Sequence, residues 1–326
     1  MTHLTRRGTL AAAATLVAAR PSRAQPAWPN RPITLLVPFA PGGASDIAAR
    51  AINTRLSERI GQSVVVENRP GANGQLAARQ LMRAAPDGHV LMVGSIGAFA
   101  LNAVLYRNPG YDPLVDFTPV TLAVTTPNVL VVNPDVAPVR SLAELVAWMK
   151  PRGGDVFHAT SGIGSSPHLT MELFNQLTGT SATHVPSRGG ATAVLDQLAG
   201  RVQVSFQGLG TIIGPVRDGK LRALLVTADR RTPLLPDVPT AAEAGLADFN
   251  VSSWQAVMGP AGIPAPLLDR IGAEIAAVLR EPSNAAILEA AGYSVVGNTP
   301  AEYAAFQRSE IARWRQVTTA ANIVLD

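Results

Sequence analysis

The stretch Val37–Arg50, VPFAPGGASDIAAR, runs from an apolar segment through Pro-Gly-Gly into a segment with helix-forming composition. Glycines allow sharp backbone turns and let a ligand approach the main chain. A helix that begins here leaves its first N–H groups without internal partners, and its dipole places about half a positive charge at that end. Because the turn has no lysine, it differs from a nucleotide P-loop, which requires GxxxxGK[ST].

These features predict a turn that binds a small anion, and a carboxylate fits better than a triphosphate. The residues expected to contribute to this first loop are Phe39, Pro41, Gly42, Gly43, Ala44, Ser45 and Asp46. Two other interpretations stay open here. Ser45 or Asp46 serves only as a helix cap in one of them, and Phe39 is a core residue in the other.

A second stretch, Ser161–His168, SGIGSSPH, repeats this order of strand end, glycines, hydroxyls and helix start. In open α/β sheets, ligands lie outside the carboxyl ends of the strands. Two such loops would face one another across a cleft. The residues expected to contribute to this second loop are Ser161, Gly162, Gly164, Ser165 and His168.

Apolar, β-branched runs alternate with helix-period segments along the chain, and the βαβαβ order occurs twice. This pattern predicts an α/β fold with two doubly wound lobes and a ligand cleft between them. The chain leaves the first lobe over 111–124 and returns over 230–245, so two crossings would form a hinge. We expect lobe 1 to comprise 25–122 plus 238–326, and lobe 2 to comprise 123–237.

Three further polar residues stand where predicted strands end: Ser95, Arg188 and Gln207. Arg188 would supply a charge to a distal carboxylate of the ligand. Each of the three can also be read as a helix cap or part of a surface turn.

The first 24 residues have the pattern of a signal peptide: paired Arg6 and Arg7, a short Ala/Leu/Val run, and Ser22-Arg23-Ala24. The adjacent arginines favour the twin-arginine route. Four of the 27 basic residues lie in this segment, which leaves 23 against 23 acidic ones. That balance argues against nucleic-acid binding, which requires a basic face. We therefore expect a soluble exported protein.

Enzyme chemistry is not indicated by the sequence. It contains no cysteine, and its histidines lack HxxxH spacing, so we expect neither thiolate chemistry nor a metal. Ser165 does not stand in the G-x-S-x-G of a nucleophile elbow, and nothing orients His168 as its base. GLGTIIG (208–214) has the wrong spacing for a dinucleotide fingerprint. We expect no cofactor and no catalytic residues.

Six segments together resemble the receptors of tripartite tricarboxylate transporters, the Bug-type solute-binding proteins. They are VPFAPGGASDIAAR, VVVENRPGANG, PDGHVLMVG, SGIGSSPHL, GKLRALLVTADRRTPLLPDVPTAAEAG and SSWQAVMGPAGIPAPLL. The resemblance implies a periplasmic receptor, similar to type II periplasmic binding proteins, whose lobes close on a small organic acid. It implies delivery of that acid to a membrane permease of one large and one small subunit, and we expect the receptor to be a monomer.

In this family the two glycine loops hold the proximal carboxylate, and the distal end of the ligand meets the positions of Ser95, Arg188 and Gln207. The chain departs from the family at Asn73, in PGANG, and at Ser187, in VPSRGG. Two alternatives remain open: a carboxylate-sensing partner of a signalling protein, and an exported enzyme that acts on carboxylates.

Overall fold

The computed structural model describes residues 28–187, 189–247, 249–320 and 323–325. The proposed signal peptide, Met1–Ala24, and Arg188 lie outside these ranges. In the described residues the strands form one ten-stranded mixed sheet in the order β2-β1-β3-β9-β4-β7-β5-β6, with β10 and β8 also paired to β4. Helices cover both faces, which confirms the predicted α/β fold.

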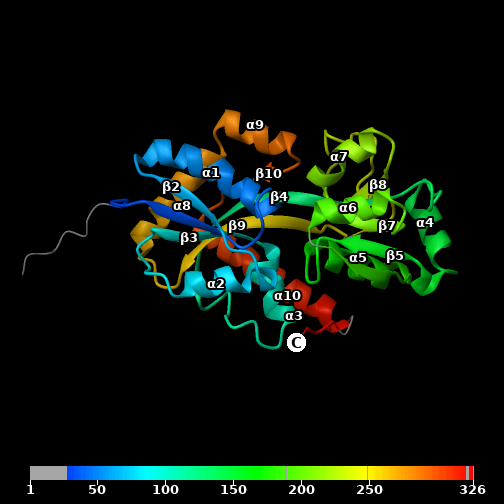
Figure 1. Ribbon diagram of the computed structural model, residues 1–326, viewed down its shortest axis with the longest axis horizontal. Coiled ribbons are helices and arrows are strands. Elements are labelled where there is room, and N and C mark those ends of the chain that lie inside the picture. The colour runs from blue at the N-terminus through cyan, green and yellow to red at the C-terminus, as the bar shows by residue number, and fades with distance from the viewer. Residues whose placement is uncertain (1–27, 188, 248, 321–322, 326) are drawn as a thin grey trace, which may run out of the picture.

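Two groups of elements lie at opposite ends of the molecule's long axis (Figure 1). The first half contains β1 (Ile33–Val37), α1 (Ala44–Ile60), β2 (Val64–Asn68), η1 (Ala72–Gly74), α2 (Gln75–Met82), β3 (Val90–Ser95), η2 (Gly97–Leu101), α3 (Asn102–Leu105), β9 (Ser252–Pro260), α8 (Ala265–Leu279), α9 (Pro282–Ala290) and β10 (Ser294–Val295). The second half contains α4 (Leu142–Met149), η3 (Gly153–Asp155), β5 (Phe157–Thr160), α5 (Ser166–Thr178), β6 (Thr183–Pro186), α6 (Gly190–Leu198), β7 (Val204–Gly208), α7 (Leu209–Arg217) and β8 (Arg222–Val226).

The strand β4 (Phe117–Val132) belongs to both halves. Its segment Phe117–Pro127 pairs with β9, and its segment Asn128–Val132 pairs with β7. The joining segment expected over 111–124 therefore lies largely inside a 16-residue strand. Both pairings are antiparallel, whereas β1, β2 and β3 pair in parallel, as do β5, β6 and β7. The predicted parallel units are thus joined by an antiparallel centre.

The helix α10 (Pro300–Ala320) also contacts both halves. Gln307 Nε2 donates to Phe99 O in the first half at 2.9 Å, and Gln176 Nε2 of α5 donates to Val317 O at 3.3 Å. Glu310 is buried under the centre of the sheet and accepts hydrogen bonds from the indoles of Trp254 and Trp314. The C-terminal helix therefore packs on both halves and not on the first alone.

The helices that follow the two glycine loops begin and end at residues with local signals. The helix α1 ends at Gly61, whose left-handed backbone lets its N–H donate to Ser57 O. The helix α5 has Ser165 as its N-cap and Pro167 in its first turn, and it ends in the same way at Gly179. Short-range chemistry thus determines the boundaries of both helices.

Candidate functional site

The first glycine loop is held together by the carboxylate of Asp46. Its Oδ2 accepts hydrogen bonds from Gly42 N–H at 2.9 Å and Arg50 Nε at 2.8 Å, and its Oδ1 accepts one from Asn68 Nδ2 at 2.9 Å. Asn68 Nδ2 also donates to Phe39 O at 3.0 Å. Asp46 is only 2 % exposed. Its side chain therefore faces the loop's own backbone and stabilises the turn.

The amides at the start of α1 are the groups that remain for a ligand. Gly43 is the N-cap, and no side chain caps this helix in the described part of the chain. The first backbone bond into the helix runs from Ile47 N–H to Gly43 O at 2.9 Å. The N–H groups of Ala44, Ser45 and Asp46 precede that bond and so have no acceptor within the helix, and Gly42, at φ +79°, makes the turn that leads into it.

Ser45 connects the first loop to the central strands. Its Oγ donates to Gln255 Oε1 on β9 at 2.6 Å, and both residues are buried. Gln255 is the register partner of Ser95 on β3. Ser45, Gln255 and Ser95 therefore belong to one polar region, of which Ser45 and Ser95 were predicted from the sequence and Gln255 was not. The alternation in SSWQAVM is the signal for Gln255, because Trp254 and Gln255 must point to opposite faces of the strand.

The second glycine loop satisfies most of its own amides. Ser165 Oγ donates to Gly162 O at 2.7 Å and accepts from His168 N–H at 3.4 Å. His168 Nδ1 accepts from Gly164 N–H at 3.3 Å. The imidazole therefore bonds the loop backbone and does not contact the Ser165 hydroxyl, which is the geometry of a helix start and not of a nucleophile and its base.

His168 belongs to a stack of three imidazoles, with His184 of β6 in the middle and His158 of β5 beyond it. The ring centroids of His168 and His184 are 4.0 Å apart, and those of His184 and His158 are 4.9 Å apart. Since the rings lie nearly parallel, their nitrogens do not converge on one point as metal ligands would. No cluster suited to a metal ion occurs within the ranges that the structure covers.

Burial lowers the pKa of all three stacked histidines, to about 3 for His158 and His168 and to about 4 for His184. The neighbouring His184 ring lowers the pKa values of His158 and His168 further. Neutral imidazole retains a lone pair on one nitrogen, and the bond from Gly164 N–H to His168 Nδ1 requires that lone pair. The neutral stack therefore supports the second loop at ordinary pH.

Gln207, at the end of β7, is 1 % exposed and has a fixed amide orientation. Its Nε2 donates to Ala159 O at 3.2 Å, so its Oε1 must point the other way, toward Gly190 at the start of α6. That oxygen is buried and has no hydrogen-bond partner among the described residues. Ser161 is half-buried at the adjoining end of β5.

Both glycine loops border the turn at 71–74. A Cβ built on Gly74 would lie 3.0 Å from Pro38 Cβ, which adjoins the first loop. A Cβ built on Gly164 would lie 3.2 Å from Asn73 Nδ2 and 2.9 Å from Leu105 Cδ1. These separations are closer than ordinary contact, so the second loop packs directly on the first half. The structure thus brings both loops to one turn, which contains Asn73, a residue that was not among the predicted site residues.

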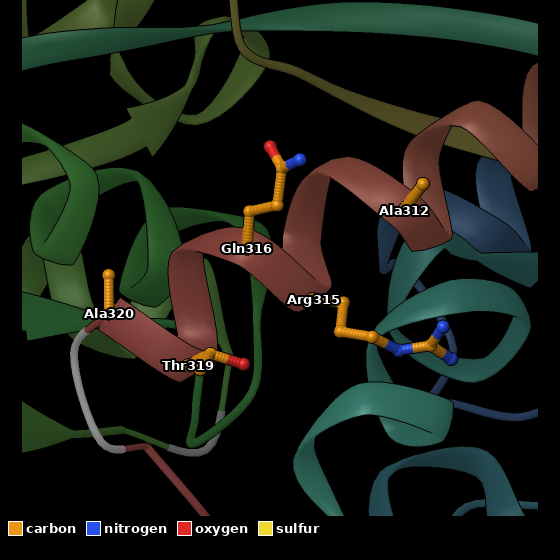
Figure 2. Close-up of a pocket in the computed structure, with 5 residues that line it drawn as sticks. All are labelled: Ala312, Arg315, Gln316, Thr319 and Ala320. Carbon is orange, nitrogen blue, oxygen red and sulfur yellow. The ribbon is translucent and has the colours of Figure 1, made fainter.

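Two hollows of the described surface lie elsewhere. One, of about 530 Å³, is lined by five residues of α10 alone (Figure 2). The side chains of Arg315 and Gln316 point in different directions there, so no polar groups converge. The other, of about 480 Å³, lies beside Glu310, Arg313 and Phe306. Neither contains a residue of the glycine loops.

The chain is similar to several known proteins. Residues 48–323 match the model of the tripartite tricarboxylate transporter family receptor. Protein BugT of Bordetella pertussis is 36% identical over 291 residues, which cover 89% of each chain. The structure of Rpa4515 from R. palustris with adipate matches with a TM-score of 0.84 and 38% identity, covering 91% of this chain and 99% of that one. MatC from Rhodopseudomonas palustris with bound malate matches with a TM-score of 0.81 and 33% identity, covering 89% and 99%.

Proposed function

This chain belongs to the tripartite tricarboxylate transporter family of receptors, and from that premise we propose that it captures a small organic carboxylate between two closing lobes and passes it to a membrane permease. The observation that carries the proposal is the meeting of both glycine loops at the turn 71–74. A ligand held by the first loop is then within reach of the second.

The uncapped start of α1 is the proposed anchor for the proximal carboxylate. Its three leading N–H groups and the helix dipole favour a negative charge without any cationic side chain. The buried Asp46 carboxylate forms an ion pair with Arg50 and also accepts hydrogen bonds from Gly42 N–H and Asn68 Nδ2. The second loop contributes less through amides, since those of Gly164 and His168 already have acceptors. Its role is to cover the ligand and offer the Ser161 hydroxyl, while Ser165 Oγ, which donates to Gly162 O, holds the loop in shape.

The lobes of this proposal are 25–122 plus 238–326 and 123–237, joined through β4. Ser95, Arg188 and Gln207 are proposed to meet the distal end of the ligand. The unpartnered Gln207 Oε1 supports a ligand-facing role for that residue, and Ser95 lies beside the polar region of Ser45 and Gln255. Closure would then be a population shift that a ligand stabilises only by touching both lobes.

The proposed partners are a permease of one large and one small subunit, with the receptor acting as a monomer and not as an enzyme. Relatives are named as periplasmic proteins, and export through the segment 1–24 is part of the proposal. No helix in the described ranges is long and apolar enough to cross a membrane.

The test is a thermal-shift screen of the mature protein against adipate, malate and a panel of mono-, di- and tricarboxylates. We expect at least one acid to raise the melting temperature, because a ligand that binds only the folded state stabilises it. The same screen followed by product analysis separates binding from turnover. Stabilisation by none of the acids would contradict the proposal.

Gly43→Leu is the matched loop variant. Gly43 has extended backbone, φ −78° and ψ 169°, and its nearest neighbour to a built Cβ is Ala40 O at 3.4 Å, so the local fold accepts a side chain. A leucine there would cover the amides of α1, and we expect the ligand-induced shift to disappear. The control is Gly214→Leu, at a helical position with nothing within 4 Å of a built Cβ, which should keep the shift.

A further inference from the structure

Asn73 occupies a strained position at the centre of the turn shared by the two loops. Its backbone is left-handed, with φ +49° and ψ +38°, a conformation that asparagine and glycine tolerate better than other residues. A built Cβ on Gly97 would lie 3.3 Å from Asn73 Oδ1 and 3.3 Å from Ser95 Oγ. The side chain of Asn73 therefore lies between the Ser95 region of the first half and Gly164 of the second.

A buried network fixes the orientation of the Asn73 amide. Its Nδ2 donates a hydrogen bond to Asn102 Oδ1 at 2.8 Å, and Asn102 Nδ2 donates one to the backbone carbonyl oxygen of Asn73 at 2.9 Å. Asn102 is fully buried, and its second amide hydrogen goes to the Tyr111 hydroxyl, which in turn donates to Ala98 O. Every donor of Asn102 is used, so the pair has one arrangement and cannot rotate freely.

The same amide nitrogen forms part of the surface on which the second loop rests. A side-chain carbon at Gly164 would lie 3.2 Å from Asn73 Nδ2 and 2.9 Å from Leu105 Cδ1. Gly164 has φ +71°, and its N–H is held by His168, so this part of the second loop is also rigid. Two preorganised surfaces, one from each half, therefore meet at this point.

We propose that Asn73 stabilises the closed arrangement of the two halves. Its side-chain amide, whose orientation is fixed by Asn102 and Tyr111, is the group that the loop containing Gly164 contacts when the halves close. This inference rests on the proposed function, because it requires two halves that open and close. Asn73 then sets how much of the ligand-free protein is already closed. A receptor that is closed for a larger fraction of the time binds its ligand with a lower apparent Kd.

The variant that tests this role is Asn73→Gly. Glycine accepts the left-handed backbone without strain, so the turn persists while the side-chain amide that contacts the Gly164 loop is removed. The matched control is Ala72→Gly, since Ala72 is the exposed neighbour in the same turn and also has a positive φ of 46°. This control relaxes the turn equally but leaves the contact with Gly164 in place. Urea unfolding of both variants verifies that they fold.

The measurement uses two spin labels, one on each half, in the ligand-free protein. The chain contains no cysteine, so Ser63→Cys and Ser181→Cys, both at exposed positions, introduce unique attachment sites. Pulsed electron paramagnetic resonance then gives the distribution of distances between the halves. We expect Asn73→Gly to shift this distribution away from that of the parent, with a smaller closed population, and Ala72→Gly to leave it unchanged.

A second measurement is the Kd for adipate or malate, whichever stabilises the parent. We expect Asn73→Gly to raise the Kd by about three- to tenfold, as a loss of preformed closed state would do. Superimposable distance distributions for Asn73→Gly and the parent would overturn the proposal, even if the Kd changed, because Asn73 would then act on the ligand alone. Equal shifts for Ala72→Gly would also overturn it.

The two proposals can fail separately. If no carboxylate binds, the proposed function fails, but the ligand-free distances still decide the role of Asn73. If a carboxylate binds the parent and the distances do not respond to Asn73→Gly, only the closure role is lost.

Discussion

Asp46 is the residue on which the geometry of the first loop most depends. Burial alone would raise the pKa of its carboxyl, but hydrogen bonds from Arg50, Gly42 and Asn68 together outweigh burial and hold the pKa below its ordinary value. The charged form is therefore stabilised in the folded protein. This contribution is present above the ordinary pKa of an aspartate and is lost as the pH falls through the lowered one.

Asp46→Asn tests that role. All three partners of the carboxylate are donors, so an amide NH2 must oppose at least one of them. We expect the free energy of unfolding to fall by about 1–3 kcal/mol, measured by urea denaturation at pH 7. Asp237→Asn, at an exposed position, makes the same chemical change and should stay within about 0.5 kcal/mol of the parent. Equal losses in the two variants would show that the loop does not need the charge.

The elements β5, β6 and α5 are connected through the histidine stack, and this makes the second half sensitive to acid. The folded protein holds these rings neutral, with pKa values of about 3, 3 and 4, whereas unfolded histidines titrate near 6.5. Their contribution to stability is therefore complete above about pH 6.5 and is lost as the pH falls toward those values. Glu172, whose carboxylate lies 3.8 Å from His168 Nε2, also faces the stack from α5, and burial raises its pKa.

His158→Phe should reduce this acid sensitivity. His158 is fully buried, and neither ring nitrogen has a hydrogen-bond partner among the described residues. Replacing the imidazole with a phenyl ring therefore removes no hydrogen bond. Removing one such proton-binding group lowers the dependence of the unfolding free energy on pH by up to about 1.4 kcal/mol per pH unit. Urea midpoints taken between pH 6 and pH 4 measure that slope for parent and variant. Parallel slopes would show that the stack does not govern acid unfolding.

Across the whole molecule, the halves also touch where α7 meets the end of α9. A Cβ on Gly210, in α7, would lie 2.5 Å from Ala291 O, so no side chain fits between them. A Cβ on Gly292 would likewise lie 2.9 Å from Gly210 N. The relative placement of the halves therefore depends on a glycine at position 210.

Gly210→Ala and Gly214→Ala form a matched pair within α7. Both replace a helical glycine with alanine, which by helix propensity alone stabilises by up to about 1 kcal/mol. Gly214 has open space around a built Cβ, but the ring of Pro215 that follows it disfavours a helical backbone for a residue with a Cβ. We therefore expect Gly214→Ala to stay within about 1 kcal/mol of the parent. For Gly210→Ala we expect a net loss of about 1–3 kcal/mol, because the methyl group overpacks the contact with Ala291. Urea unfolding of both measures the difference, and equal stabilities would contradict the contact.

Local signals were sufficient to predict the two loops and the helices after them. The helix expected to begin after the first glycine loop is α1, and the one expected to begin after the second is α5. Both are confirmed because caps and glycine stops act within a few residues of the sequence. The family was also correct, since residues 48–323 match the model of the tripartite tricarboxylate transporter family receptor. Arg188 and the signal peptide fall outside the described residues, so those predictions stand untested.

The amino-acid sequence by itself determined the α/β architecture and the positions of the glycine loops, because both depend on residue type and near neighbours. The lack of a lysine in these loops was likewise evident from the sequence. Only the tertiary structure decided which amides stay open: Gly42 and Gly164 pair internally, while the start of α1 does not. It also placed Ser45 against Gln255 and Asn73 against Asn102. Such pairs are far apart along the chain, and no local pattern specifies them, since they form only when packing brings distant polar groups together away from water.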